Sequence, residues 1–375
     1  MAGFTARSAA ALMVFLAASL GVVSLDSGAA SAAGITVYSR VANGDVPPIR
    51  VLSGPATSLV VPQDDIADPL NDELYVADFH ASAILVFSRS ASGDVAPIRT
   101  IAGAATLLSG PVGLYVDTVN NEIGVVSGST AILIFSRMAS GNVPPLRTIS
   151  GAATGLSLAK GLTVDTVNDE IVVASTGNDS IRAFGRTASG DVVPLRVLSG
   201  ADTGLAGGGG QVPRVDTTNN ELIVTNAFTN SVLVFTRTAS GNVVPLRTIA
   251  GAATGLNVPV GVYVDEDVNL VFGNNEIGVA NLSGNSILVF SRTVDGNVAP
   301  LRTISGPLTG LNQPVQLALD RLNDEIFVVN LADPVVVPPT VVAAPTLSEW
   351  AQIVMVALLV VGGLLALRRR VPVLR

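Results

Sequence analysis

A short phrase, aromatic-x-Arg, recurs roughly every 50 residues along this chain, and no other feature constrains the fold as strongly. The six copies end at Arg40, Arg89, Arg137, Arg186, Arg237 and Arg292. Each is followed by a G-[DN]-V turn and, ten positions after its arginine, by a second arginine: Arg50, Arg99, Arg147, Arg196, Arg247 and Arg302. Such a period indicates supersecondary units that stack and bury a shared core.

One unit, from Pro111 to Ser150, predicts four short strands at residues 111–117, 122–126, 131–137 and 143–150. Asn-Asn or Asn-Asp separates the first two strands, where a hairpin needs residues that tolerate positive φ. Ser-Gly-Asn or Ser-Gly-Asp marks the turn before the fourth strand, whose prolines suit an outer edge. Four strands in about 50 residues are typical of a β-propeller blade.

The chain holds six copies of the third and fourth strands, beginning at Ile35, and six of the first and second, ending at Asn330. We therefore predict an all-β, six-bladed propeller over residues 34–330, with four-stranded blades. Its closing blade is shared between the two ends of the mature chain. A linear β-solenoid is the alternative, but it offers no reason for this complementary split.

A charge pattern predicts cross-strand ion pairs between the start of strand two and the end of strand three. The pairs are Glu73/Arg89, Glu122/Arg137, Glu170/Arg186, Glu221/Arg237, Glu276/Arg292 and, through ring closure, Glu325/Arg40. In an antiparallel hairpin with a short loop these residues lie opposite each other, so we expect the pairs mainly to fix the register.

Composition excludes several kinds of chemistry. The chain has no cysteine and one histidine, His80, so it lacks thiol catalysis, thiolate metal sites and a two-histidine metal site. Its net charge is −8, and removing the two ends leaves the body more acidic, which argues against nucleic acid as a partner. We expect no cofactor, no metal and no catalytic residue, with His80 on the surface.

The first 33 residues resemble neither a blade nor a linker. Arg7 precedes an apolar run from Ala9 to Leu25, and Ala30-Ser31-Ala32 fits an A-x-A cleavage site. This order predicts a secretory signal peptide over residues 1–33 that signal peptidase removes. A first transmembrane helix is the alternative, which the small residues that follow directly make weaker.

The last part of the chain predicts an anchor. Residues 331–344 form a Pro/Val-rich linker, and residues 351–367 are uncharged and long enough, at ~1.5 Å per residue, for a short transmembrane helix. Trp350 suits one interface, and Arg368, Arg369 and Arg370 suit the cytoplasmic side as a membrane stop. The propeller then faces out of the cytoplasm, in agreement with the signal peptide.

The unit P-x-G-L-x-V-D…N-[DN]-E-I-x-V-A…S-I-L-V-F-x-R resembles the NHL repeat family. The residues that carry the resemblance include "PVGLYVDTVNNEIGVVSGSTAILIFSR" and "PVQLALDRLNDEIFVVN". It covers about residues 35–330 and implies a propeller, a fold that hosts binding scaffolds as well as hydrolases and lyases. The fourth copy, "GLAGGGGQVPRVD", departs from the pattern with a glycine run at 207–210, which we interpret as an inter-strand insertion rather than a phosphate loop.

The tail over residues 345–370 resembles the IPTL-CTERM sorting signal, which is similar to the PEP-CTERM signal of exosortase systems in Gram-negative bacteria. Its motif residues are Pro345, Thr346, Leu347, Ser348, Glu349 and Trp350, followed by the apolar helix and the arginine triplet. Ala344 and Ala351 depart from it, where the family has Ile and Gly. The resemblance implies an exosortase-like transpeptidase and transient anchoring in the inner membrane, with the propeller in the periplasm. The cell surface or extracellular matrix is then the destination.

For function, the blades offer Thr, Asn, Ser and Gly on variable loops between strands two and three, with the "GAATGL" connections on the same rim. This favours a binding or structural module for a polysaccharide or protein ligand. The alternative is a lactonase- or lyase-like hydrolase with a site at the channel mouth. A mouth of Glu, Asp, Asn and His would favour the enzyme, and one of Thr, Val and Gly would favour binding. The Asp of each V-D-x-x-N could ring a cation, but we expect it to cap its own turn.

Overall fold

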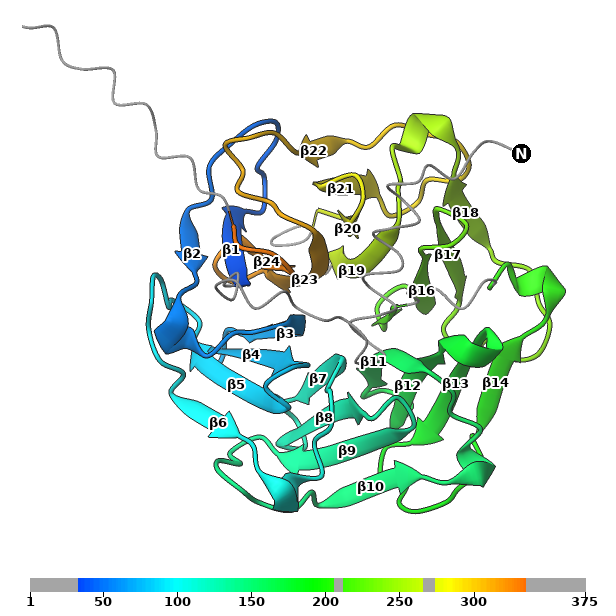
Figure 1. Cartoon of the computed structure of the whole chain (residues 1–375). Coiled ribbons are helices and arrows are strands. Elements are labelled where there is room, and N and C mark those ends of the chain that lie inside the picture. The colour runs from blue at the N-terminus through cyan, green and yellow to red at the C-terminus, as the bar shows by residue number, and fades with distance from the viewer. Residues whose placement is uncertain (1–32, 206–211, 266–273, 335–375) are drawn as a thin grey trace, which may run out of the picture. The chain divides into compact units, whose positions relative to one another are not determined.

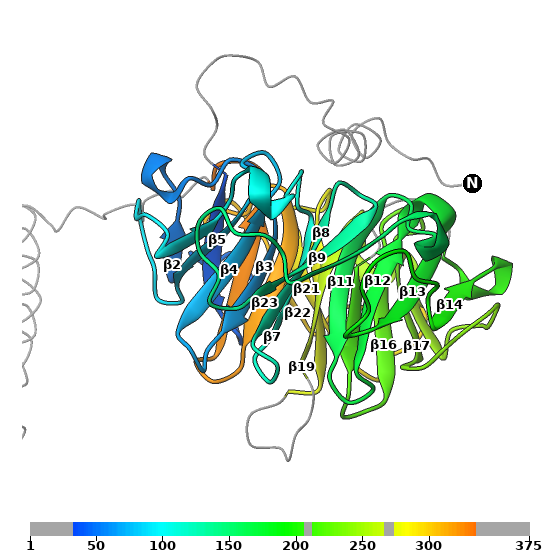
Figure 2. The ribbon, with the colours of Figure 1, turned by 90° about the horizontal axis from the view of Figure 1, so that it is seen from below.

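The computed structural model describes residues 33–205, 212–265 and 274–334. These residues form six four-stranded antiparallel sheets arranged around one axis, so the predicted six-bladed propeller is confirmed (Figure 1). Seen at right angles, the sheets stand side by side around that axis (Figure 2). The signal peptide, most of the linker, the sorting motif, the predicted helix at 351–367 and the arginine triplet lie outside the described residues. The described part contains no helix that could cross a membrane.

The blades are numbered here in chain order of their first strands. Blade 1 contains β3 (Pro62–Asp68), β4 (Glu73–Asp78), β5 (Ala83–Ser88) and β6 (Arg99–Ile101). Blade 2 contains β7 (Gly113–Asp117), β8 (Glu122–Ser127), β9 (Ala131–Ser136) and β10 (Arg147–Ser150). Blade 3 contains β11 (Ala159–Asp165), β12 (Glu170–Ser175), β13 (Ser180–Gly185) and β14 (Arg196–Ser199).

Blade 4 contains β15 (Pro213–Asp216), β16 (Glu221–Asn226), β17 (Ser231–Thr236) and β18 (Arg247–Ala250). Blade 5 contains β19 (Pro259–Asp265), β20 (Glu276–Asn281), β21 (Ser286–Ser291) and β22 (Arg302–Ile304). Blade 6 contains β23 (Pro314–Asp320), β24 (Glu325–Asn330), β1 (Gly34–Ser39) and β2 (Arg50–Leu52). Short 3-10 helices lie at η1 (Pro55–Thr57), η2 (Ala104–Thr106), η3 (Ala152–Thr154), η4 (Thr176–Asn178), η5 (Ala201–Thr203) and η6 (Ala252–Thr254).

Blade 6 closes the ring as predicted from the complementary split. Its strands run in the order β2-β1-β24-β23, and β1 pairs with β24 from Gly34 opposite Asn330 to Ser39 opposite Glu325. Tyr38 in this blade also donates a 2.5 Å hydrogen bond to the Thr309 carbonyl of the preceding connection. Both ends of the propeller are thus held by a complete antiparallel ladder.

The outer strand of each blade is shorter than predicted, because it begins at the second arginine rather than at the prolines. In blade 2 the sequence predicts a strand over residues 143–150, and the strand is Arg147–Ser150. Pro144 and Pro145 have no N–H to give to a ladder, which explains the late start. The next blade then covers the outer edge: Gly93 of blade 1 donates to the Val51 carbonyl of β2 at 2.7 Å, and Asp94 accepts from Ala56 N–H at 2.6 Å. Parallel bridges of the same kind recur around the ring.

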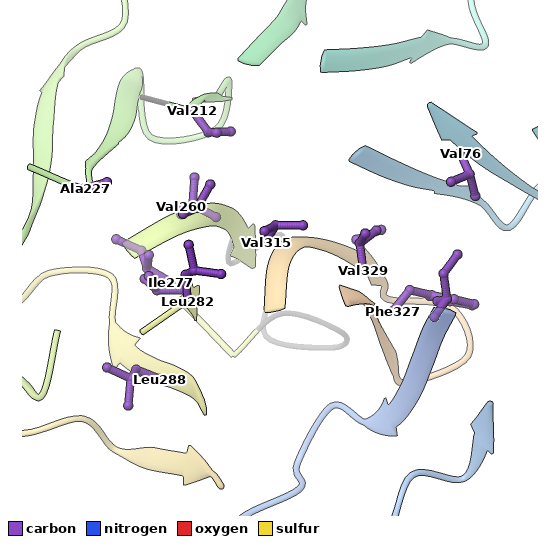
Figure 3. Close-up of a cluster of buried hydrophobic side chains, with 14 of the residues drawn as sticks. Val76, Val212, Ala227, Val260, Ile277, Leu282, Leu288, Val315, Phe327 and Val329 are labelled. Atoms are coloured by element: carbon purple, nitrogen blue, oxygen red, sulfur yellow. The ribbon is translucent and has the colours of Figure 1, made fainter. Parts of the chain in front are cut away.

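The core lies between neighbouring blades. The aromatic residue of each aromatic-x-Arg phrase is fully buried, and the set is Tyr38, Phe87, Phe135, Phe184, Phe235 and Phe290. Figure 3 shows labelled members of the largest apolar cluster, including Val76 of β4 and Phe327 and Val329 of β24. Burying a side chain of this size stabilises a fold by about 1.5–3 kcal/mol, so these interfaces provide most of the driving force.

The turn between the first two strands is built as expected. In blade 2, Asp117 accepts hydrogen bonds from the Asn120 backbone N–H at 2.9 Å and from its side chain at 2.8 Å. The αL residue of this turn is Asn121, with φ of 59°. The equivalent aspartates Asp68, Asp165, Asp216 and Asp320 make the same two bonds, so the capping interpretation is confirmed.

The predicted ion pairs within each hairpin are wrong, because the register differs by one residue. Glu73 lies opposite Ser88, not Arg89, and the other five blades repeat this offset. Successive side chains of a strand point to opposite faces of the sheet, so each glutamate and its predicted arginine lie on different faces. The pairs Glu73/Arg89, Glu122/Arg137, Glu170/Arg186, Glu221/Arg237, Glu276/Arg292 and Glu325/Arg40 are replaced by two other sets.

The first set lies within a blade: the second-strand glutamate binds the arginine of the outer strand. Its members are Glu73–Arg99, Glu122–Arg147, Glu170–Arg196, Glu221–Arg247, Glu276–Arg302 and Glu325–Arg50. The same outer arginine also donates to the main-chain carbonyl of the third-strand arginine in the next blade, as Arg147 does to Arg186 at 3.0 Å.

The second set joins neighbouring blades: the third-strand arginine reaches a carboxylate of the preceding blade. The contacts are Arg89–Glu325, Arg137–Glu73, Arg186–Glu122, Arg237–Asp165, Arg292–Glu221 and Arg40–Asp265. We call the two sets together the arginine latch. It links every blade to the next at the rim where the first strand ends.

Candidate functional site in the axial channel

The inner strands β3, β7, β11, β15, β19 and β23 surround the axis and approach one another closely. The glycine of the P-x-G phrase makes this approach possible, since a Cβ on Gly113 would lie 2.2 Å from the Lys160 carbonyl oxygen of the next blade. A Cβ on Gly161 would likewise lie 2.9 Å from the Cα of Val212. The channel is therefore narrow and filled mainly by side chains.

Blade 1 departs from this pattern with two adjacent carboxylates. By register, Asp64 stands where blade 2 has Gly113, and Asp65 stands where it has Leu114. Both are fully buried. Asp64 accepts hydrogen bonds from the Leu114 N–H at 2.8 Å and from the Asp65 N–H at 2.9 Å, so its charge has partners.

The Asp65 carboxylate is different, because neither of its oxygens has a hydrogen-bond partner among the described residues. Its ladder partner Val76 belongs to the same apolar cluster as Phe327 and Val329 of blade 6. Asp65 thus occupies a core position at the seam between blades 1 and 6, where an ionised carboxylate is costly.

Arg214 comes from β15 in blade 4, on the opposite side of the ring. Its Nη2 lies 3.6 Å from Asp64 Oδ1, and its Nη1 donates to the carbonyls of Leu162 at 3.3 Å and Pro213 at 3.2 Å. Blades 2 and 5 carry Tyr115 and Tyr263 at the equivalent position. Arg214 therefore crosses the axis toward the carboxylate of blade 1.

Burial shifts the pKa values of this group. Desolvation raises the pKa of Asp64 to about 6, against the opposing charge of Arg214 and hydrogen bonds that include one from Gln316. Desolvation and the neighbouring Asp64 raise the pKa of Asp65 well above its ordinary value. Burial also lowers the pKa of Lys160, on β11, to about 8. Each shift follows from removing a charge from water.

Two cavities lie along the axis. One of about 20 Å³ is bounded by Gln63, Lys160 and Gln316 together with Val112, Gly161, Val212, Val260 and Val315, and it has room for a single water molecule. The other, of about 150 Å³, lies farther along the inner strands, beside Arg214 and Ile66. We expected the channel lining to separate an enzyme from a binding module, and the first cavity does not separate them cleanly. Valine and glycine make up most of its lining, as expected for a binding module, but two glutamine amides and the Lys160 ammonium group also line it.

The residues singled out from sequence do not meet at this site. His80 is exposed in the loop after β4, as expected. The loops between strands two and three do share a rim with the inter-blade connections, since Ser109 N–H donates to Ser127 Oγ at 2.8 Å. The sorting motif and the glycine run at 207–210 lie outside the described residues. Among the described residues, no three His, Cys, Asp or Glu side chains cluster as a metal site would require.

Sequence reasoning missed Asp64, Asp65, Lys160 and Arg214. A signal was present, because each breaks the repeat at an inner-strand position where most blades carry an apolar residue or glycine. Aligning the repeats position by position would have marked all four. Their convergence on the axis, however, depends on ring closure and on which face each residue occupies.

Comparison with known proteins gives a likeness in fold and no function. No protein-family model matches the chain, and no curated protein matches it. Among solved structures, the chain is similar to the WD40 β-propeller domain of Doa1, with a TM-score of 0.45 and 12% identity, covering 69% of this chain and 72% of that one. Functional conclusions therefore depend on the residues of this chain.

Proposed function

We propose that this protein is an exported, cell-surface-destined β-propeller that acts as a binding or structural module and is delivered by a C-terminal sorting signal. One observation carries the proposal: Gly34 pairs with Asn330, so the ring is complete between these residues. The closed ring takes its strands from residues 34–330, which supports the proposal that the segments before Gly34 and after the linker serve as removable addresses. β1 begins at Gly34, beside the expected signal-peptidase site.

We assign the propeller to the NHL type on its repeat chemistry. The P-x-G glycine lets inner strands approach, the V-D-x-x-N aspartate caps its hairpin, and the F-x-R arginine reaches the preceding blade. Each phrase residue thus has a physical role in a ring of blades. The resemblance supports a scaffold and leaves its ligand to be found on the loops.

The ends of the chain supply the address in this proposal. The signal peptide directs export, and signal peptidase cleaves near residue 33. The segment 351–367 then anchors the protein in the inner membrane of a Gram-negative cell, with Arg368–Arg370 in the cytoplasm and the propeller in the periplasm. An exosortase-like transpeptidase acts at Pro345–Trp350 and releases the protein to the surface.

A binding or structural role suits the described geometry better than the lactonase- or lyase-like alternative. The smaller axial cavity has room for one water molecule only, and valine and glycine make up most of its lining. The arginine latch ties each blade to the next, which gives a rigid platform for the variable loops between strands two and three. The ligand we propose for these loops is a polysaccharide or a protein.

The test is intact-mass analysis of the protein isolated from its native host. We expect an N-terminus at Ala33 or Gly34 and a C-terminus between Pro345 and Trp350. Glu349→Ala with Trp350→Ala should leave the C-terminus unprocessed, and Val341→Ala with Val342→Ala in the linker should be processed normally. A wild-type chain that still ends at Arg375 would contradict sorting and leave a permanent anchor.

A further inference from the structure

Blade 3 departs from the repeat at one position of its third strand. Arg182 of β13 lies opposite Val173 of β12. The equivalent residues of blades 1, 2, 4 and 5 are leucines that are buried in the apolar clusters between blades: Leu85, Leu133, Leu233 and Leu288. Blade 3 therefore carries a charged group where the fold requires only an aliphatic side chain.

The Arg182 guanidinium has no countercharge in the described part of the chain. Every other arginine described there has a carboxylate oxygen within 3.6 Å. Burial lowers the pKa of Arg182, whereas hydrogen bonds to glutamates raise the pKa values of Arg99 and Arg147. Because arginine stays protonated in proteins, Arg182 carries a charge that no described carboxylate compensates.

This guanidinium lies at the rim formed by the loops between strands two and three and the inter-blade connections. It covers Gly155, in the connection from β10 to β11, since a Cβ on Gly155 would lie 2.6 Å from Nη1 and 3.1 Å from Nη2. Nη1 makes one long hydrogen bond, of 3.4 Å, to the Thr154 carbonyl. Nε is enclosed, but Nη2 is not, and it donates to no described residue. With the side chain only partly buried, an oxygen atom of a ligand can reach Nη2 from solvent.

The loop beside Arg182 also differs from its counterparts. Between β12 and β13 the chain forms η4, the only 3-10 helix among the described loops between second and third strands. Asn178 of η4 is exposed, and its side-chain amide donates to the Gly155 carbonyl at 2.9 Å. Ser157, in the same connection as Gly155, is partly exposed and lies against the loop, since a Cβ on Gly177 would be 2.4 Å from its Oγ. A guanidinium, an amide and a hydroxyl are thus gathered at one place on the rim.

From this accessible, uncompensated guanidinium and the polar groups beside it, we infer that the rim over blades 2 and 3 binds an acidic polysaccharide through Arg182. A uronate carboxylate accepts from the guanidinium, and hydroxyls of the sugar bond to Asn178 and Ser157. Protein interfaces depend on buried aromatic and aliphatic anchors, and residues 151–158 and 176–179 expose no large hydrophobic side chain. The inference deepens the proposed function and rests on it, because it takes these loops as a binding surface.

The test uses the full-length chain in a nonionic detergent and saturation-transfer NMR with tetragalacturonate as the probe. We expect a Kd on the order of 1 mM. The methyl ester of the same tetrasaccharide, which is neutral, should bind at least about tenfold more weakly. Arg182→Leu should also weaken tetragalacturonate binding about tenfold or more, since it removes a charged hydrogen bond. This variant should fold at least as stably as the wild type in urea, because four other blades carry leucine at that position.

Arg321→Thr is the matched control. It removes the same charge from the turn after β23, on the opposite rim, and gives blade 6 the residue that blades 2 and 3 carry as Thr118 and Thr166. It should bind tetragalacturonate as the wild type does.

Three results would overturn the inference: equal binding of the acid and its ester, unchanged binding in Arg182→Leu, or equally tight binding of tetraglutamate, which would indicate an acidic protein as the partner. None of them affects the intact-mass result, so a failure of this inference is distinguishable from a failure of export and sorting. Equal binding of acid and ester would also leave a glycan-binding module in place without an anion site.

Discussion

Arg137 Nη1 on the third strand of blade 2 lies 2.9 Å from Glu73 Oε2 on the second strand of blade 1. The other carboxylate oxygen of Glu73 binds Arg99 of its own blade, so one carboxylate joins two blades. The neighbouring arginines and the Tyr75 hydroxyl hold the pKa of Glu73 below its ordinary value, against the effect of burial. Glu122, Glu221 and Glu325 likewise each bind one arginine of their own blade and one of the next blade. The repeat therefore connects neighbouring blades through shared carboxylates.

Removing that carboxylate should loosen the first interface. We expect Glu73→Gln to lower the free energy of unfolding by about 2 kcal/mol, because it leaves Arg99 without a carboxylate partner among the described residues and leaves Arg137 only the more distant Asp68 carboxylate, at 3.8 Å. Urea unfolding at pH 7 measures the change. The control is Asp72→Asn, whose exposed carboxylate lies 3.4 Å from Arg89 and should matter by less than about 1 kcal/mol. Equal losses in the two variants would refute a special role for the latch.

Asp65 is the clearest case of a residue that opposes stability. Blades 2 and 3 carry Leu114 and Leu162 at the equivalent position. We therefore expect Asp65→Leu to raise the free energy of unfolding at pH 7 by about 2 kcal/mol, since it replaces a buried carboxyl group that lacks hydrogen-bond partners among the described residues. Urea unfolding of the variant beside the wild type gives this number. A destabilised Asp65→Leu would show that the carboxylate has a favourable partner in the folded chain.

The raised pKa of Asp64 predicts a pH dependence with a definite sign. Its ordinary pKa is 3.8 and its folded pKa is about 6, so the folded state holds the proton more tightly than the unfolded state. The stability that this group contributes is complete below pH 3.8 and is lost as the pH rises through 6. Relative to Asp64→Asn, which cannot ionise, the wild type should lose about 3 kcal/mol between about pH 4 and pH 7.

Unfolding curves of both proteins at several pH values test this, because taking their difference cancels the titration of groups that do not interact with Asp64, and Asp65→Leu introduced into both proteins removes the neighbour that does. The glutamates of the latch would otherwise obscure the effect: the pKa values of Glu73 and Glu122 are lowered, so their contribution is lost as the pH falls. A pH-independent difference between wild type and Asp64→Asn would mean that Asp64 titrates alike in both states.

The fold could be predicted from the repeat because each repeated phrase specifies a turn or a strand through residues that are close together in the sequence. Prolines mark the turn before the outer strand, Asp117 caps a hairpin with Asn120, and the split of the strands between the two ends specifies closure. The turns and caps depend on residues close together in the sequence, and the closure follows from counting the strands at each end of the repeat region. The ring of six four-stranded blades could therefore be predicted from the amino-acid sequence alone.

Side-chain partners could not be predicted in the same way. A register difference of one residue turns Arg89 away from Glu73 and toward the preceding blade, and sequence spacing does not resolve one residue. The axial group depends on a longer-range fact: Asp64 and Arg214 meet because blades 1 and 4 lie opposite each other. Such contacts require the closed ring.

The P-x-G glycine of the inner strand gives a last prediction, about packing rather than charge. Gly113 does not have positive φ, so its requirement is space: an added Cβ would lie 2.2 Å from the Lys160 carbonyl oxygen. Because that oxygen belongs to the backbone of the next inner strand, the clash can be relieved only by moving blades apart. We expect Gly113→Ala to lower the free energy of unfolding by about 1–3 kcal/mol. Gly185→Ala, where a Cβ would meet no atom within 4 Å, should change it by less than about 0.5 kcal/mol. Urea unfolding of both alanine variants shows why the chain needs glycine at residue 113. If close packing is the reason, only Gly113→Ala is destabilised, whereas an effect of chain flexibility would be similar in both variants.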